Sequence, residues 1–181
     1  MDHINPLIEY GHIHFGENKV QEALEKWTEV KSNNNKIKLH MIGKLQTNKV
    51  KFAVQIFDYI HSLDNEKLAK KISEEQAKIN KKLKLFIQIN IGSEDQKSGI
   101  DKKNVYDFAQ YCKELNLDVI GTMCLPPNDN NQNLYFSEMQ KINSKLYYND
   151  LSMGMSNDYL NAVEFKSSFL RVGSKIFGSR Y

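Results

Sequence analysis

Short apolar runs alternate along the chain with longer segments in which apolar residues recur about once per helical turn. The short runs predict β-strands, because each is bounded by Gly, Asn or Asp and is too brief for a helix. The clearest is residues 85–91, which is nearly continuously apolar, as a parallel strand buried on both faces should be. The predicted strands are residues 13–16, 39–42, 57–62, 83–91, 119–124, 151–153 and 169–172.

Four of the longer segments have the periodicity of amphipathic helices. In the first, Val20, Leu24 and Trp27 lie about one turn apart, and Trp27 is assigned to packing. Asp64 is the expected N-cap of the second. The four segments are residues 20–30, 65–79, 101–115 and 134–147. A strand followed by a helix, repeated along the chain, indicates a parallel α/β architecture.

Two parallel α/β folds compete for this pattern. A doubly wound sheet carries a glycine-rich fingerprint after its first strand, and Phe15-Gly16-Glu17-Asn18 is not one. A (β/α)8 barrel has eight strands and roughly 200 to 250 residues, whereas this chain has 181 residues and seven predicted strands. The pattern favours an α/β, (β/α)8 TIM-barrel-like fold in a single domain over residues 1–181 that lacks one β/α unit.

Composition excludes several classes of function. The chain has 25 Lys and Arg against 22 Asp and Glu, a net charge of +3, and the two signs are interspersed, so no nucleic-acid partner is expected. No apolar run reaches about 18 residues, and the N-terminus lacks a secretory pattern. We therefore expect a cytoplasmic protein with no membrane partner. Cys112 and Cys124 are not spaced as metal ligands and should remain thiols.

The most informative polar residues follow the last two predicted strands. Gly154 and Ser156 follow one strand, and Gly173 and Ser174 follow the other, directly after Arg171. In barrels of this type phosphate often binds after strands 7 and 8, where a glycine lets backbone amides approach an anion. An arginine in a lysine-rich chain is expected there for its planar set of donors. Each turn alone is equally typical of a helix cap, but together they predict a phosphate site.

Other polar residues have simpler interpretations. Glu17 and Asn18 end the first strand, where a turn that caps the following helix is expected. His40 lies inside an apolar strand and is expected to be a hydrogen-bonded core histidine. His12 and His14 alternate on a strand with a spacing that suits a metal, but no third ligand follows at a suitable spacing, so no metal site is assigned.

A set of longer motifs carries a resemblance to a known family. The motifs are residues 15–22 (FGENKVQE), 40–49 (HMIGKLQTNK), 87–90 (IQIN), 97–99 (KSG), 121–123 (GTM), 151–158 (LSMGMSND) and 171–180 (RVGSKIFGSR). In this order, from about residue 5 to the C-terminus, they resemble the pyridoxal phosphate homeostasis proteins, the YggS/PROSC family.

The resemblance implies a fold-type III barrel, similar to the N-terminal domain of alanine racemase, with pyridoxal 5′-phosphate (PLP) in its mouth. It also implies a role in intracellular PLP (vitamin B6) homeostasis as a carrier or buffer without catalytic turnover. The implied cofactor contacts are Ser156, Gly173 and Ser174 to the phosphate, Arg171 to the pyridine nitrogen, Asn18 along the ring, and Asn90 and Met123 as the floor.

One family feature is missing from the chain. The resemblance places the cofactor lysine in a Val-Ser-Lys type motif on the first strand, ahead of the segment matching residues 5–11. This chain begins at Met1, after that point, so an N-terminal truncation and non-covalent PLP binding are expected. The lysines that match other family positions are Lys44, Lys49, Lys97 and Lys175, and Lys97 is expected to be solvated in its polar loop.

Three functions remain open on these grounds. The first is a PLP-binding homeostasis protein. The second is a PLP-dependent amino-acid racemase, which needs a second acid or base on the opposite face of the cofactor. The third is a degraded remnant that has lost covalent PLP binding. No residue is assigned a catalytic role.

Overall fold

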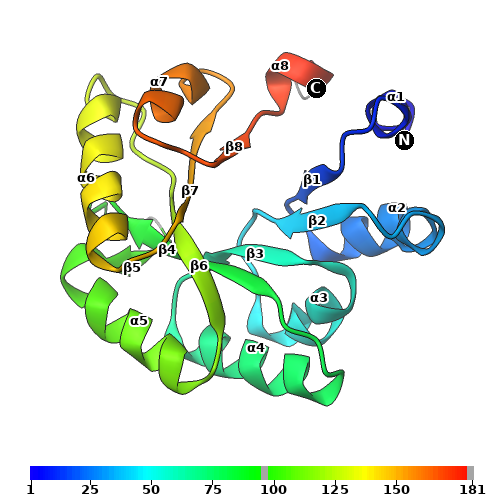
Figure 1. Cartoon of the computed structure of the whole chain (residues 1–181), viewed down its shortest axis with the longest axis horizontal. Helices are drawn as coiled ribbons and strands as arrows, with labels where there is room; N and C mark the ends of the chain where they lie inside the picture. Colours follow the sequence, from blue (N-terminus) through cyan, green and yellow to red (C-terminus); the bar gives the residue numbers. More distant parts are fainter. Residues whose placement is uncertain (95–97, 179–181) are drawn as a thin grey trace.

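The structure is a computed structural model that describes residues 1–94 and 98–178 (Figure 1). Its centre is a parallel sheet with the strand order β1-β2-β3-β4-β6-β7-β8, and the two-residue strand β5 pairs with β4 off this path. The strands are β1 (His14–Glu17), β2 (Lys38–Met41), β3 (Tyr59–Leu63), β4 (Lys84–Asn90), β5 (Ile100–Asp101), β6 (Asp118–Cys124), β7 (Asp150–Met155) and β8 (Phe169–Arg171). The seven strands of the path are those predicted from the sequence.

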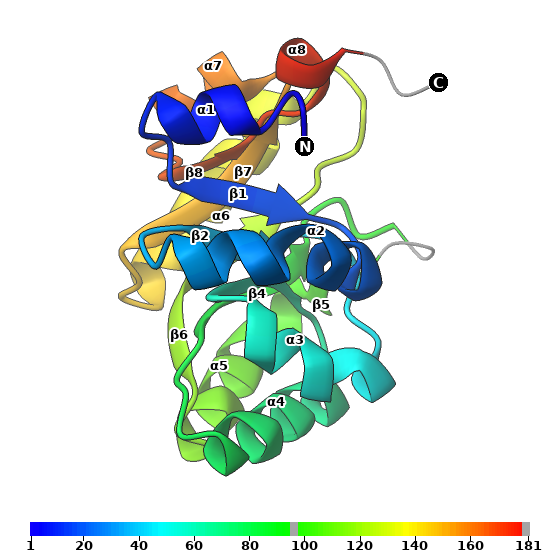
Figure 2. The ribbon, with the colours of Figure 1, turned by 90° about the vertical axis from the view of Figure 1, so that its right-hand side faces the viewer.

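Helices cover the outside of the sheet (Figures 1 and 2). They are α1 (Asn5–Glu9), α2 (Val20–Asn33), α3 (Val50–Ile56), α4 (Glu66–Lys78), α5 (Val105–Glu114), α6 (Gln132–Lys145), α7 (Tyr159–Glu164) and α8 (Ser174–Phe177), with 3-10 turns at Thr47–Lys49 and Lys102–Asn104. The four long helices were predicted. The short helices α1, α3, α7 and α8 were not, because they contain too few turns to show a period. None of the described helices combines the length and apolarity needed to cross a membrane.

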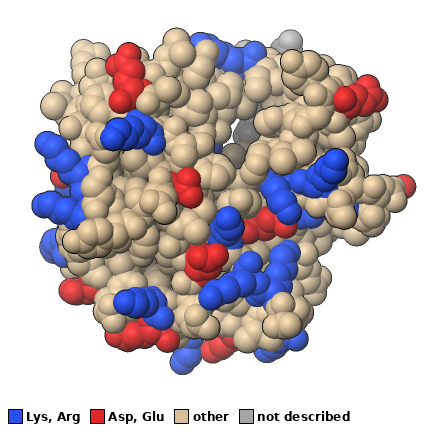
Figure 3. Space-filling model, viewed as in Figure 1, with Lys and Arg blue, Asp and Glu red and all other residues tan. Residues whose placement is uncertain are grey.

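The ring of strands is open at one place. Among the described residues, β1 pairs only with β2 and β8 pairs only with β7. The two edge strands face each other across a break in the ring (Figure 1), and the space-filling surface is hollowed there (Figure 3). Side chains nevertheless meet across the break, since the rings of His14 and Phe169 are 6.2 Å apart. The fold is therefore a nearly closed α/β barrel of seven parallel strands.

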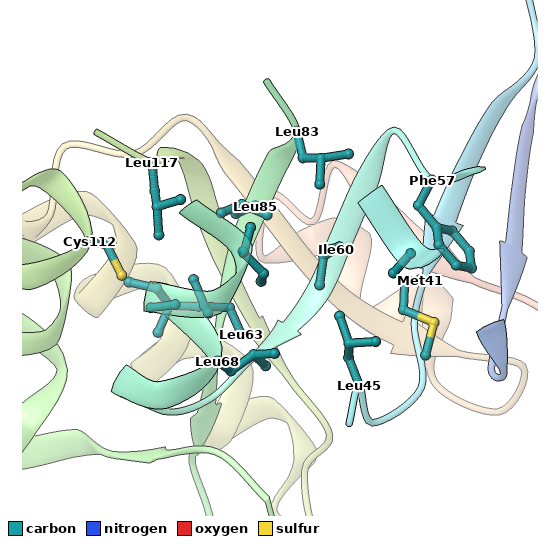
Figure 4. Close-up of a cluster of buried hydrophobic side chains, with 14 of the residues drawn as sticks. Met41, Leu45, Phe57, Ile60, Leu63, Leu68, Leu83, Leu85, Cys112 and Leu117 are labelled. Atoms are coloured by element: carbon teal, nitrogen blue, oxygen red, sulfur yellow. The ribbon is translucent and has the colours of Figure 1, made fainter. Parts of the chain in front are cut away.

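The hydrophobic core lies between the sheet and its helices. Figure 4 shows part of it, where Ile60 and Leu85 of adjacent strands belong to one buried cluster with Leu68 of α4 and Cys112 of α5. All four are at most 1% exposed. Burying a side chain of this kind contributes about 1.5 to 3 kcal/mol, so this layer stabilises the framework that carries the strand ends.

The ends of two helices differ from the expectation. Helix α4 is capped by Asn65, whose side chain accepts a 2.9 Å hydrogen bond from the Leu68 amide, and not by Asp64. The prediction was wrong by one residue. Helix α2 begins after Lys19 without a side-chain cap. Glu17 points outward instead, and its carboxylate accepts a 2.8 Å hydrogen bond from the indole of Trp27.

Candidate functional site

The turns that follow β7 and β8 are joined by a hydrogen bond. The hydroxyl of Ser156, which is buried, accepts from the amide of Gly173 at 3.2 Å. Gly173 is the N-cap of α8, which starts at Ser174. The amides of the first helical turn have no acceptor within their own helix, so those of Ser174 and Lys175 are available beside the Ser156 hydroxyl. The structure thus brings together the three residues predicted to hold a phosphate.

Two glycines shape this part of the barrel. A Cβ at Gly173 would meet no atom within 4 Å, so there is open space over its backbone. Gly154 has a φ of +91°, and a Cβ there would lie 2.6 Å from the Cβ of Ala162. Glycine is therefore required at 154 for α7 to pack on β7. A hydroxyl, first-turn amides and open space are the features that suit a phosphate monoester.

Arg171 ends β8 two positions before Gly173. Its guanidinium is fixed by two neighbouring strands: Nη1 donates to the Ser152 hydroxyl at 2.7 Å and Nη2 donates to the Cys124 carbonyl at 2.8 Å. Burial lowers the pKa of Arg171, while the carboxylate of Asp158 opposes that shift. An arginine remains protonated at neutral pH, so a fixed positive charge lies beside Ser152 and the end of β6.

A chain of three histidines runs from Ser152 through the barrel interior. The Ser152 hydroxyl lies 2.7 Å from His61 Nδ1, His61 Nε2 lies 2.9 Å from His40 Nδ1, and His40 Nε2 lies 2.9 Å from His14 Nδ1. Burial and the charge of its neighbour His14 lower the pKa of His40 to about 3. Burial, with His40 and Arg171, lowers the pKa of His61 well below 6.5. Both imidazoles are therefore neutral at pH 7.

The sequence pattern predicted only part of this row of hydrogen-bonded histidines. His40 is buried and hydrogen-bonded, as predicted for a core histidine. His61 was not singled out, although His14, His40 and His61 occupy three consecutive strands, which is the signal that could have revealed them. His12 packs against the ring of Phe15 at 5.1 Å. In the described part of the chain, no three His, Cys, Asp or Glu side chains are grouped so as to hold a metal ion.

Asn18 lies at the end of a different edge strand from Arg171. It follows β1, on the opposite side of the break, and lines a cavity of about 370 Å³ together with Lys44, Gln46 and Lys49. Its backbone is held closely, because a Cβ at Gly43 would lie 2.3 Å from the Asn18 carbonyl oxygen. Among the described residues, no hydrogen bond links Asn18 to the Ser156–Gly173 turn.

The remaining predicted positions have clear structural roles or lie outside the described residues. The Asn90 amide bonds the backbone of Glu94 at 2.9 and 3.2 Å and so holds the turn after β4. Met123 is fully buried. Lys175 Nζ lies 4.8 Å from the ring centroid of Tyr159. Lys97 belongs to the segment 95–97, which the structure does not describe.

Comparison with known sequences gives consistent matches over almost the whole chain. The profile of the family described as "Alanine racemase, N-terminal domain" matches residues 2–181. The chain is 37% identical over 176 residues to a pyridoxal phosphate homeostasis protein of Aquifex aeolicus, which covers 92% of this chain and 76% of that protein. It is 36% identical over 181 residues to one from Pasteurella multocida, covering 94% and 78%.

Solved structures extend the comparison to the fold. PipY of Synechococcus elongatus, determined without PLP, superposes with a TM-score of 0.90 at 30% identity, covering 98% of this chain and 87% of that one. PipY with PLP bound superposes with a TM-score of 0.83 at 29% identity, covering 97% and 86%. Alanine racemase from Bartonella henselae, with a TM-score of 0.74 at 16% identity over 96% of this chain and 48% of that one, shares the fold. The barrel predicted from the sequence is confirmed.

Proposed function

Because the chain belongs to the pyridoxal phosphate homeostasis protein family, we propose that it binds PLP at the carboxyl ends of β7 and β8 and serves in PLP homeostasis as a carrier or buffer. One observation carries the proposal. The hydrogen bond from the Gly173 amide to the Ser156 hydroxyl joins two turns that are separate in the sequence, which supports a shared anion site formed by that hydroxyl and the first amides of α8. PipY of Synechococcus elongatus has been solved with PLP bound, which supports the same ligand here.

The residues present suit the phosphate. The Ser156 hydroxyl proton and the backbone amides of Ser174 and Lys175 would supply donors, because the Gly173 amide already donates to the Ser156 oxygen, and the open space over Gly173 leaves room for the anion. Hydrogen bonds to an ionised group contribute about 1.5 to 3 kcal/mol each. The phosphate is therefore the part of the ligand that this end of the barrel would hold most firmly.

Arg171 would set the protonation of the pyridine nitrogen. When bound, PLP supplies a ring that can act as an electron sink, and a protonated ring nitrogen strengthens that ability. The guanidinium of Arg171 can only donate hydrogen bonds. A ring nitrogen that accepts a hydrogen bond from it would therefore remain unprotonated. The proposed contacts Ser156, Gly173, Ser174 and Arg171 include no group that exchanges a proton near pH 7, which favours a carrier or buffer over a racemase.

Binding by this 181-residue chain is proposed to be non-covalent. Lys175, which is close in sequence to the proposed phosphate site, places its ammonium over the Tyr159 ring. Lys44 and Lys49 line the separate cavity next to Asn18. The ammonium groups of these three lysines have other surroundings in the described structure, which supports non-covalent binding. Borohydride treatment of the PLP-loaded chain is expected to leave no lysine adduct in the intact mass, and a stable adduct would refute non-covalent binding.

Titration with PLP and with pyridoxal, which lacks the phosphate, tests the site. Absorbance or Trp27 fluorescence should report PLP binding, and pyridoxal should bind at least roughly tenfold more weakly because the phosphate contacts are lost. Ser156→Ala should weaken PLP binding roughly tenfold and leave pyridoxal binding unchanged.

Ser62→Ala is the matched control for this titration. Ser62 is also buried, but its hydroxyl has no hydrogen-bond partner in the described structure, so its loss should not change affinity. Equal affinities for PLP and pyridoxal would overturn the assignment of the phosphate to this turn.

A further inference from the structure

The histidine chain in the barrel interior has only one consistent arrangement of its protons. Arg171 cannot accept a hydrogen bond, so at the 2.7 Å contact its Nη1 donates and the Ser152 oxygen accepts. The other partner of that hydroxyl is His61 Nδ1, also at 2.7 Å. Ser152 is fully buried, and its hydroxyl proton therefore goes to His61 Nδ1, which must be unprotonated.

The same reasoning extends along the chain. A neutral imidazole has one N–H and one bare nitrogen, so His61 carries its proton on Nε2 and donates to His40 Nδ1 at 2.9 Å. His40 then carries its proton on Nε2 and donates to His14 Nδ1 at 2.9 Å. His14 also becomes an Nε2–H tautomer, and its ring is exposed next to the break in the barrel. The reversed arrangement would leave the buried Ser152 proton without an acceptor, which disfavours it by roughly tenfold or more.

We propose that His14, His40, His61 and Ser152 form a directional hydrogen-bonded chain that positions the guanidinium of Arg171 and fixes all three imidazoles as Nε2–H tautomers. This inference rests on the proposed function only in its consequence for PLP, since the chain exists in the protein without a ligand. Every donor points from Arg171 toward the break. A proton from solvent cannot enter the chain at His14 Nε2, which already bears one, until all three tautomers reverse.

The proposed consequence is a stable environment for the ligand. The Arg171 guanidinium is held by hydrogen bonds to the Ser152 hydroxyl and to the Cys124 carbonyl. A guanidinium fixed in this way presents its remaining N–H groups at the carboxyl end of β8, and the chain behind it does not deliver a proton. His14, His40 and His61 are positioning residues in this scheme, because they act through Ser152 and not on the ligand.

Two-bond 1H–15N correlation spectra of the ligand-free protein at pH 7.5 test the chain, since they report which imidazole nitrogen bears the proton. All three histidines should be Nε2–H tautomers. Arg171→Gln replaces the donor-only group by one that can also accept, and it should produce a detectable Nδ1–H population even at the distant His14. Ser62→Ala, next to His61 but outside the chain, should change none of the three tautomers.

His40→Phe provides a second variant that keeps the ring stacked on Tyr59, where the His40 ring now lies 4.1 Å away at an angle of 13°. It should release His14 into a mixture of tautomers and leave His61 as Nε2–H. The proposal would be overturned by an Nδ1–H or doubly protonated imidazole at His14, His40 or His61 in the wild-type protein. It would also be overturned if the tautomer of His14 were the same in the wild type and in both variants. Because no PLP is present, these results stand or fall independently of the PLP titration.

Discussion

Acid should unfold this protein through its buried histidines. The folded-state pKa of His40 is lowered to about 3 from 6.5, and burial of His61 lowers its pKa well below 6.5. A histidine whose pKa is lowered by folding does not reduce the unfolding free energy above pH 6.5, because it is neutral in both states. Below that pH the unfolded state binds a proton that the folded state does not, so stability falls as the pH falls toward the folded pKa.

The size of the effect follows from these values. Each pH unit below 6.5 costs about 1.4 kcal/mol per such histidine, so at pH 4.5 His40 alone removes about 2.7 kcal/mol. His61, which is 1% exposed, adds to this loss in the same direction, because its pKa is also lowered. Domains are typically stable by about 5 to 15 kcal/mol. Protonation of the unfolded state at His40 alone therefore removes a substantial part of the total stability between pH 6.5 and pH 4.5, and His61 adds to it.

Urea denaturation at pH 7.5 and pH 4.5 measures this loss, with the fluorescence of the single, buried Trp27 as the probe. The relevant quantity is the fall in unfolding free energy between the two pH values. His40→Phe should reduce that fall by about 2 to 3 kcal/mol, even if the variant is less stable at both pH values. His3→Gln removes an exposed histidine and should leave the fall unchanged. An equal fall in wild type and His40→Phe would refute the reasoning.

Two further predictions concern the framework. Asn65→Ala should lower the unfolding free energy by about 1 kcal/mol because the cap of α4 is lost. Asp64→Ala should change it by less than about 0.5 kcal/mol. Thermal denaturation distinguishes the two variants, and equal effects would contradict the capping assignment. Gly154→Ala should cost about 2 to 4 kcal/mol through its positive φ and the contact with Ala162. Gly11→Ala, with a φ of +97° in open space, should cost about 1 to 2 kcal/mol in the same assay.

Much of the architecture was predictable because it depends on local patterns. Apolar runs and helical periodicity identify the seven strands of the sheet path and the four long helices. The cap of α4 was misplaced by one residue, because Asp64 and Asn65 are equally good N-caps in sequence and only the backbone conformation of Asn65 selects it. Glu17 was taken for a turn residue, because strand direction alone does not show that it points outward to Trp27.

The sequence by itself determined the order of the β/α units and the presence of glycine- and serine-containing turns after the last two strands of the path, since both are encoded within a few residues. The histidine chain was decided only by the tertiary structure. His61 and Ser152 are 91 positions apart, and His14 and His40 are 26 apart. These side chains meet because the register between the parallel strands determines which inward-facing side chains of different strands lie at the same height along the barrel axis. That register depends on packing across the whole barrel, and so does the break between β1 and β8.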